Sequence, residues 1–264
     1  MHVPDSRAGR ASSLSISPAF RARTERDARP EKPESRPPVT APVRLLITAG
    51  PTHEPIDAVR YLGNRSSGKL GTAIADEAAR RGWTVTLLLG PTPRLPAHPS
   101  VRCLRFQTAD DLGGLLRETV SEHDALIMAA AVSDFRPAPH ERGEPGTKRR
   151  RTDARLSLDL EPTPDLIAEC ARGRTGGPLL VGFALEPEAG LLEAARGKLD
   201  RKGIDVIVAN PLETMDSDQI RATLLGRAGT GLEGGRASPG TMDKDAFAGW
   251  LLDAVAELIE RRHA

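Results

Sequence analysis

Cysteines and long apolar runs are both scarce in this sequence, and each shortage argues against a class of protein. The two cysteines, Cys103 and Cys170, have no CxxC partner or nearby histidine cluster, which excludes a disulfide framework and argues against a zinc site. The longest apolar runs, 125–132 and 179–185, are far below the roughly 18 residues that span a bilayer. We therefore expect a soluble, cytoplasmic protein with no membrane partner.

An excess of one charge is also lacking. Lysine and arginine total 37 against 36 aspartates and glutamates, so the whole protein has no field that would attract nucleic acid. Any site for a polyanion must be local, and we expect no nucleic-acid partner. The 264 residues with 39% apolar content suit one domain of about 200 residues plus a tail.

Residues 1–42 differ in composition from the remainder. They hold seven of the 22 prolines, eight basic and five acidic side chains, and few large apolar groups. Such a segment buries too little surface to offset the entropy lost on ordering, so we predict a disordered tail followed by a domain at 43–264. Its acids and prolines argue against an organelle transit peptide.

From Val43 onward, β-rich runs alternate with stretches of helical period. This alternation predicts an α/β fold with a Rossmann-like, doubly wound, mostly parallel sheet and helices on both faces. Strands are expected at 44–48, 84–89, 101–106, 124–130, 179–184 and 205–209. Helices are expected at about 70–81, after Thr108, from Thr163, at 188–202 and at 243–263.

Two helix starts have specific capping signals, and two segments interrupt the alternation of β-rich and helical stretches. Thr108 with Asp111 predicts an N-cap with an acidic third residue, and Thr163 is the expected cap before Pro164 at the first helical position. The segment 137–155 is polar, basic and rich in glycine and proline, which predicts a mobile basic flap. The segment 226–240 is expected to be a hairpin or loop without a site.

The loop 63–69 is the first candidate for chemistry, together with Gly50 directly after the first strand. It nearly satisfies the Walker pattern GxxxxGK[ST], but Leu70 stands where a magnesium-binding hydroxyl belongs. Small residues before a helix still let backbone N–H groups approach an anion, so phosphate binding is one interpretation. The alternative is a turn that only permits close helix packing.

Three further segments contain small or charged residues that are suited to bind a ligand. The run 129–136 leaves room for a flat ring beside Asp134, which could accept hydrogen bonds from a ribose or base, or cap a turn. Residues 148–151 are all basic, as in a solvated face, a nucleic-acid segment or a flap that closes over phosphates. Lys198 and Lys202 share one helical face, which is usually exposed to solvent.

Together these segments resemble the synthetase domain of bacterial phosphopantothenoylcysteine synthetase, which is usually fused behind a flavin-dependent decarboxylase. The matching stretches are 47–71, 129–137, 148–151, 161–169, 181–186 and 198–210. The resemblance implies a ligase of coenzyme A biosynthesis that couples 4'-phosphopantothenate to L-cysteine through an acyl-nucleotide. It also implies CTP as the preferred co-substrate, giving CMP and pyrophosphate, with ATP as the alternative and Mg²⁺ as the accompanying ion.

The resemblance assigns roles residue by residue. Asn64 and Lys148 are the expected catalytic residues, and Asn64, Arg65, Ala131 and Asn210 are expected to bind the acid substrate. The expected nucleotide-binding residues are Gly50, Ser66, Ser67, Gly68, Met128, Ala129, Ala130, Asp134, Lys148, Pro164, Asp165, Leu166, Ile167, Phe183, Lys198 and Lys202. No dedicated protein metal site and no flavin are expected, whereas a homodimer and a separate decarboxylase protein are.

The sequence departs from the family in its flap and after the Gly-Phe-Ala segment. The family's flap usually reads Lys-x-Lys-Lys, whereas arginines at 149–151 follow Lys148 here. Pro187 replaces a threonine common in the family, which removes a hydroxyl and a backbone donor. Two other functions remain open. An NAD(P)-binding Rossmann oxidoreductase would need GxGxxG and an acid after the second strand, and neither Asp57 nor Asp76 stands there. A non-catalytic nucleotide-binding module would bind without releasing pyrophosphate.

Overall fold

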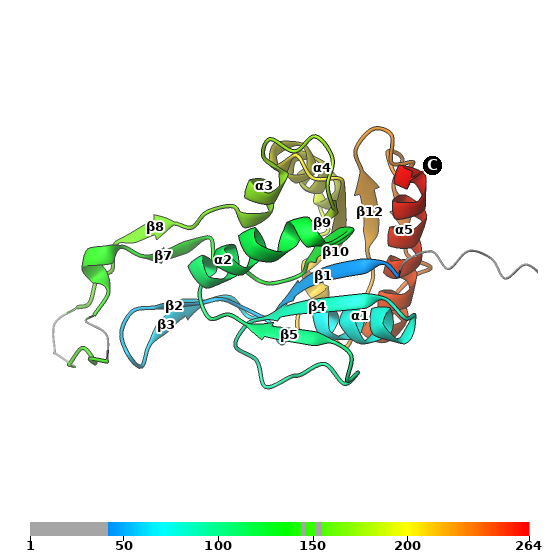
Figure 1. The fold of residues 1–264 in the computed structure, drawn as a ribbon. Coiled ribbons are helices and arrows are strands. Elements are labelled where there is room, and N and C mark those ends of the chain that lie inside the picture. The colour runs from blue at the N-terminus through cyan, green and yellow to red at the C-terminus, as the bar shows by residue number, and fades with distance from the viewer. Residues whose placement is uncertain (1–41, 144–145, 151–154, 264) are drawn as a thin grey trace, which may run out of the picture. The chain divides into compact units, whose positions relative to one another are not determined.

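A computed structural model describes residues 42–143, 146–150 and 155–263 (Figure 1). The chain separates into 1–40 and 41–264, and the account below concerns the second unit. The expected tail therefore lies outside the described residues, apart from Pro42, and so do 144–145 and 151–154 of the expected flap.

The core of the domain is an eight-stranded sheet with the order β13-β12-β10-β9-β6-β1-β4-β5. Six strands are parallel, and β12 and β13 extend the sheet antiparallel at one edge. The bounds are β1 Arg44–Ala49, β4 Thr84–Leu89, β5 Arg102–Arg105, β6 Ala125–Met128, β9 Leu179–Glu186, β10 Val206–Pro211, β12 Thr223–Gly226 and β13 Arg236–Ala237. The predicted doubly wound fold and its six strands are confirmed.

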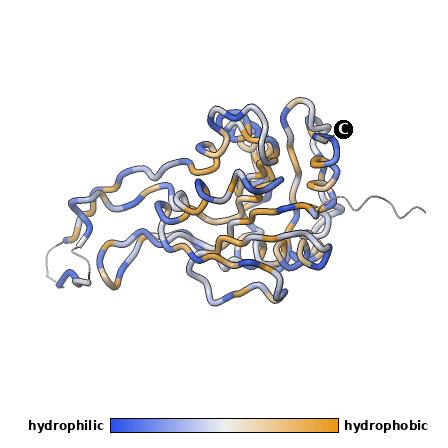
Figure 2. Tube along the Cα trace, viewed as in Figure 1, coloured by the Kyte–Doolittle hydropathy of each residue, from blue (hydrophilic) through white to orange (hydrophobic). Residues whose placement is uncertain are grey.

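Helices cover both faces of this sheet. Helices α1 (Lys69–Arg80) and α5 (Lys244–His263) pack on one face, and α2 (Ala109–Thr119), α3 (Leu166–Ala171) and α4 (Leu191–Lys202) on the other (Figure 1). Leu45 and Ile47 of β1 belong to the first core and Leu46 to the second, as the alternation of side chains along a strand requires. Figure 2 shows the resulting concentration of apolar residues along the central strands.

The helix starts agree with the sequence in one case and differ in another. At α2 the expected capping box is present, with Thr108 Oγ1 accepting from Asp111 N at 3.1 Å and Asp111 Oδ2 accepting from Thr108 N at 2.9 Å. The predicted cap of α3 is wrong, because Asp165 is the N-cap and its Oδ1 accepts from Ala168 N at 3.3 Å. The Thr163 hydroxyl instead donates to Ser133 O, which ties this connection to the end of β6.

Several short elements lie outside the main sheet. Strand β2 (His53–Pro55) pairs with β3 (Tyr61–Gly63), β7 (Phe135–Pro137) with β8 (Leu160–Pro162), and β11 (Gln219–Ile220) with β14 (Met242–Asp243). The first two hairpins extend together away from the main sheet (Figure 1). Short 3-10 turns occupy Val120–Glu122, Pro139–Glu141 and Leu212–Thr214. The expected hairpin at 226–240 is present as β12 and β13.

The described part of the basic segment 137–155 is bonded to the turn between β2 and β3. Arg149 N donates to Asp57 Oδ2 at 3.1 Å, and Ala58 N donates to Thr147 O at 2.9 Å. The Arg60 side chain and nearby backbone N–H groups hold the pKa of Asp57 well below its usual range. This carboxylate therefore stays charged and joins the turn to the basic segment.

Close packing of α1 on β1 requires a glycine. A Cβ at Gly71 would lie 2.3 Å from Ala49 Cβ, so Gly71→Ala should lower the free energy of unfolding by about 1–3 kcal/mol through overpacking. Gly197 lies inside α4 with open space around it, so Gly197→Ala should instead raise that free energy by about 0.5–1 kcal/mol. Urea titrations of both variants check this pair, and equal midpoints would contradict the close approach.

Candidate functional site

A cleft of about 760 Å³ opens at the carboxyl ends of the parallel strands. Strand order reverses between β1 and β6, and doubly wound sheets bind ligands at this switch point. The cleft is lined by the loop before α1, the residues after β6, the starts of α3 and α5, parts of β9, α4 and β10, and the segment before β11. Elements far apart in the sequence thus contribute to one concave surface.

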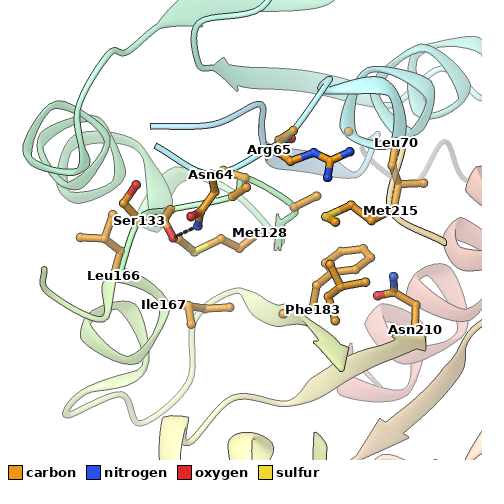
Figure 3. Close-up of a pocket in the computed structure, with 18 of the residues that line it drawn as sticks. Asn64, Arg65, Leu70, Met128, Ser133, Leu166, Ile167, Phe183, Asn210 and Met215 are labelled. Atoms are coloured by element: carbon orange, nitrogen blue, oxygen red, sulfur yellow. Dashed lines mark hydrogen bonds between the residues drawn. The ribbon is translucent and has the colours of Figure 1, made fainter. Parts of the chain in front are cut away.

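Nearly all of the residues predicted from sequence line this cleft. They are Asn64, Arg65, Ser66, Ser67, Gly68, Met128, Ala129, Ala130, Ala131, Asp134, Pro164, Asp165, Leu166, Ile167, Phe183, Lys198, Lys202 and Asn210. In Figure 3, Asn64 lies on the side of Met128 and Ser133, whereas Asn210 lies at the other end beside Phe183. The structure therefore brings these residues together around one cleft.

Gly50 and Lys148 are the two predicted residues that do not line the cleft. Gly50 has φ of +81°, and a Cβ there would lie 3.3 Å from Gly90 N and Cα. The glycine therefore lets the backbone after β1 pass close to the backbone at Gly90. Lys148 is exposed and lies with Val59, Arg60, Arg149 and Arg150 around a smaller depression at the β2–β3 turn. Within one chain, Lys148 is therefore not part of the cleft.

Backbone bonds beyond the ends of β1 and β6 shape the floor of the cleft. Ala131 N donates to Gly50 O at 2.9 Å, Ala130 N to Thr48 Oγ1 at 3.1 Å, and Ser133 N to Thr52 Oγ1 at 3.0 Å. These bonds hold a run of alanines beside the loop that follows β1. Their small side chains leave space above the sheet for a flat group.

Asn64 links the glycine-rich loop to the segment after β6. Its Nδ2 donates to Val132 O at 2.9 Å, and this bond is drawn in Figure 3. The residue is nevertheless exposed to the cleft. One bond thus fixes the direction of the amide while its oxygen stays available to a ligand.

The two lysines of α4 that line the cleft each have an acidic partner. Lys198 Nζ lies 2.5 Å from Glu186 Oε1, and Lys202 Nζ lies 2.5 Å from Asp165 Oδ2. All four side chains keep between 22% and 43% of their surface exposed, and ion pairs at exposed positions contribute about 0–1 kcal/mol each. Exchanging such a partner for a phosphate oxygen therefore costs little.

Sequence reasoning missed several residues that line the cleft. Lys69 is the last residue of the predicted loop 63–69, and Arg201 lies one helical turn from Lys198, so both could have been named as site residues. Lys244 and the segment around Met215 come from distant parts of the chain and carried no local signal. The buried Ser133 also lines the cleft, and its Oγ has no hydrogen-bond partner among the described residues.

A possible metal-binding group lies elsewhere. His140, Glu141 and Asp159 have ligand atoms within 4.8 Å of one another on the β7–β8 hairpin, but Glu141 is paired with Arg149 at 2.9 Å. None of the three lines the cleft.

Among the described residues, no helix is both long and apolar enough to span a bilayer.

Comparison with known proteins points to one family. The model of the DNA/pantothenate metabolism flavoprotein C-terminal domain matches residues 41–259. The coenzyme A biosynthesis bifunctional protein CoaBC of Vibrio cholerae is 35% identical over 225 residues, covering 84% of this chain and 54% of that protein. Its counterpart from Mycolicibacterium smegmatis is 37% identical over 247 residues, covering 87% and 56%. The chain thus spans about half the length of the curated relatives it matches.

Solved structures agree with this match. The C-terminal domain of a CoaBC protein aligns with a TM-score of 0.66 and 31% identity, covering 83% of this chain and 96% of that chain. A Streptococcus pneumoniae protein named as a DNA/pantothenate metabolism flavoprotein aligns with a TM-score of 0.67 and 26% identity, covering 81% and 98%. A Cab2 variant in complex with phosphopantothenate-cysteine, at 19% identity and a TM-score of 0.67, shares the fold.

Proposed function

Because the chain belongs to the family of the DNA/pantothenate metabolism flavoprotein C-terminal domain, we propose that it joins 4'-phosphopantothenate to L-cysteine at the expense of a nucleoside triphosphate. The observation that supports this most is the gathering of the loop 63–69, the alanines after β6 and the lysines of α4 around one cleft. A mononucleotide and an organic acid need such a combination of small residues and cations.

The first step activates the acid. A carboxylate is a poor acylating agent at neutral pH, so its oxygen attacks the α-phosphorus of the triphosphate and pyrophosphate leaves, giving an acyl-nucleotide. The protein contributes position and charge neutralisation. The N–H groups of Ser66–Gly68 at the start of α1, with Lys198 and Lys202, are suited to hold the phosphates.

The nucleoside fits the side of the cleft formed by β6 and α3. Met128, Leu166 and Ile167 are buried and apolar, and Asp134 is exposed at the rim, where it can accept from ribose hydroxyls. Backbone groups of Pro164–Ile167 can read the edge of a base. We propose CTP as the preferred triphosphate, with ATP as the alternative.

The second step forms the amide. The amine of cysteine attacks the activated carbonyl, the nucleoside monophosphate leaves, and the amine proton passes to solvent or to the leaving phosphate. Asn64, directed by its bond to Val132 O, would orient the carbonyl that is attacked by donating the second N–H of its amide to the carbonyl oxygen. Ala131 and Asn210 line the remaining space for the acid substrate.

Magnesium would accompany the triphosphate. Mg²⁺ favours oxygen ligands and usually binds through phosphates and water with one or two carboxylates. Asp134 lines the cleft as one such carboxylate, so the residues fit an ion carried in by the nucleotide. The ion would neutralise phosphate charge, and the cations of this chain would orient the nucleotide.

We also propose that the active unit is a homodimer formed by the two projecting hairpins. Large apolar side chains are exposed there, at 61% for Val59, 53% for Tyr61, 52% for Phe135 and 47% for Leu160. A second copy of the chain would cover this surface. Lys148 lies beside it and could then reach the cleft of the other subunit. A separate decarboxylase would consume the product.

The direct test mixes purified protein with 4'-phosphopantothenate, cysteine, Mg²⁺ and either CTP or ATP. Detection of the coupled product by mass, with the nucleoside monophosphate and pyrophosphate in equal amounts, is the expected result. Nucleotide binding without pyrophosphate release would favour a non-catalytic module instead.

Replacing the flap lysine tests its proposed role. Lys148→Gln should lower the rate of product formation about 10- to 100-fold, because one charge-assisted contact to a phosphate is lost. The matched control is Arg172→Gln, which removes an exposed cation beyond the end of α3 and should leave the rate unchanged. Steady-state assays at fixed ionic strength measure both, and a wild-type rate for Lys148→Gln would remove this residue from the mechanism.

Subunit exchange distinguishes the two possible locations of that contact. If Lys148 acts across the dimer, mixing Lys148→Gln with an inactive Asn64 variant forms hybrid dimers in which one cleft is intact. Part of the lost activity should then return. If mixing restores nothing although hybrids form, the contact is within one chain.

A further inference from the structure

Three cations that line the cleft come from α1, the loop before it and α5, which pack on the face of the sheet opposite α3. Arg65 and Lys69 come from the loop before α1 and from its first residue, and Lys244 is the first residue of α5. None of the three belongs to the lysine face of α4. They form a second basic region within the same cleft.

Two aspartates of one short segment cover these cations. Between the 3-10 turn at Leu212–Thr214 and β11, Asp216 pairs with Arg65 and Asp218 pairs with Lys69. The backbone O of Asp218 accepts from Lys244 N at 3.1 Å, which connects this segment to the start of α5. A single segment, 216–218, thus supplies a carboxylate to each of two cations on the glycine-rich loop.

This covering segment is exposed and has an unusual backbone. The side chains of Asp216 and Asp218 are 44% and 80% exposed, so both ion pairs contribute little to stability. Asp216 has φ of +57°, and it is the one residue other than glycine with positive φ among the described residues. That conformation disfavours most side chains but is accessible to aspartate and asparagine.

The cations remain in excess over the aspartates. The region contains four cations, Arg65, Lys69, Arg94 and Lys244, but only two aspartates, Asp216 and Asp218. Two positive charges are therefore not balanced by this pair of carboxylates. Burial, and then the neighbouring Lys69 and Arg94, lower the pKa of Lys244, while the two aspartates oppose this shift. Such mutual repulsion among cations would be relieved by an anion that carries more charge than two carboxylates.

We propose that Arg65, Lys69 and Lys244 form a diphosphate subsite, and that Asp216 and Asp218 occupy it as a displaceable carboxylate latch. The anion carries several charges and has oxygens on two phosphorus atoms, so it can contact all three cations at once. The assignment of this anion as the leaving pyrophosphate rests on the proposed function. The latch itself rests on the ion pairs and on the surplus of positive charge.

The experiment titrates inorganic pyrophosphate into the full chain at fixed ionic strength and follows the heat of binding. The double variant Asp216→Asn, Asp218→Asn removes both competing carboxylates and retains a residue that accepts positive φ at 216. It should bind pyrophosphate about 5- to 10-fold more tightly, whereas Lys244→Met should bind it about 10-fold more weakly. The control Glu118→Gln, Glu122→Gln removes two exposed acids between the last turn of α2 and the start of β6, where neither lines the cleft, and should match the wild type.

The outcomes separate this proposal from the proposed function. Equal dissociation constants in the wild type and the Asp216/Asp218 variant, or no measurable binding in either, would overturn the latch. An equal gain in the Glu118/Glu122 control would also overturn it, because general electrostatics would then explain the effect. If the expected shifts occur in a protein without ligase activity, the subsite stands and the proposed function fails. If ligase activity is present without the shifts, the reverse holds.

Discussion

Replacing Asp205 by asparagine is expected to lower the free energy of unfolding by about 3 kcal/mol or more. Its side chain has no exposed surface, and three guanidinium groups converge on it. Arg174 reaches Oδ2 at 2.9 Å, whereas Arg227 and Arg262 reach Oδ1 at 2.6 and 2.7 Å as ion pairs that lack hydrogen-bond alignment. Asparagine has nearly the same shape but no charge to balance them.

The position of Asp205 explains the size of this effect. Oδ2 also accepts from Leu180 N of β9 at 2.8 Å, so the carboxylate lies where the chain enters both β9 and β10. Arg227 follows β12 and Arg262 belongs to α5, which makes this one carboxylate common to four elements. Arg174 is 12% exposed and cannot turn to water without moving the segment before β9.

A matched pair of urea titrations measures the prediction. Asp253→Asn removes a carboxylate that is 66% exposed and pairs with Arg81, so it should cost under about 1 kcal/mol. Equal unfolding free energies for the two variants would mean that the arginines around Asp205 are satisfied by solvent.

The variant Asn64→Asp is expected to slow product formation about 100- to 1000-fold, the range found when a group that stabilises a reacting carbonyl is lost. Aspartate keeps the size of the side chain but cannot donate to Val132 O, so the bond that directs the amide is lost. The step that suffers most should be attack by cysteine on the acyl-nucleotide.

Single-turnover measurements without cysteine locate the defect. Pyrophosphate release and the dissociation constant for the nucleotide should stay near wild type, while coupling falls. Gln107→Glu makes the same change from amide to acid at an exposed position that does not line the cleft, and should leave every step intact. A normal coupling rate for Asn64→Asp would exclude Asn64 from the chemistry.

Much of the fold could be predicted because the central strands and helices carry strong local signals. The apolar run at 44–48 and the spacing of Leu70, Ile74 and Ala78 each indicate one element, and both are present. The predicted N-cap of α3 was wrong because Thr163 and Asp165 are both residue types that favour this position. A tertiary bond from Thr163 to Ser133 O decided between them, and no local pattern reveals such a bond.

The projecting hairpins and the part of the cleft at α5 lay beyond sequence reasoning for a different reason. Strands β2, β3, β7 and β8 have three residues each, too few for an alternating pattern, and three of them contain proline. Lys244 joins the cleft only because β14 pairs with β11 and brings the start of α5 beside Asp218. Residues in the segments that resemble the family were predicted, whereas Lys244 and Met215, which lie outside those segments, were not.

Isotope transfer tests most directly the claim that this cleft activates a carboxylate at the α-phosphorus of a nucleotide. The protein is supplied with 4'-phosphopantothenate labelled with ¹⁸O in its carboxyl group, together with CTP, Mg²⁺ and cysteine, and the products are analysed by mass. The account predicts one ¹⁸O atom in CMP and unlabelled pyrophosphate. Label in inorganic phosphate, or coupled product with unlabelled CMP, would contradict it.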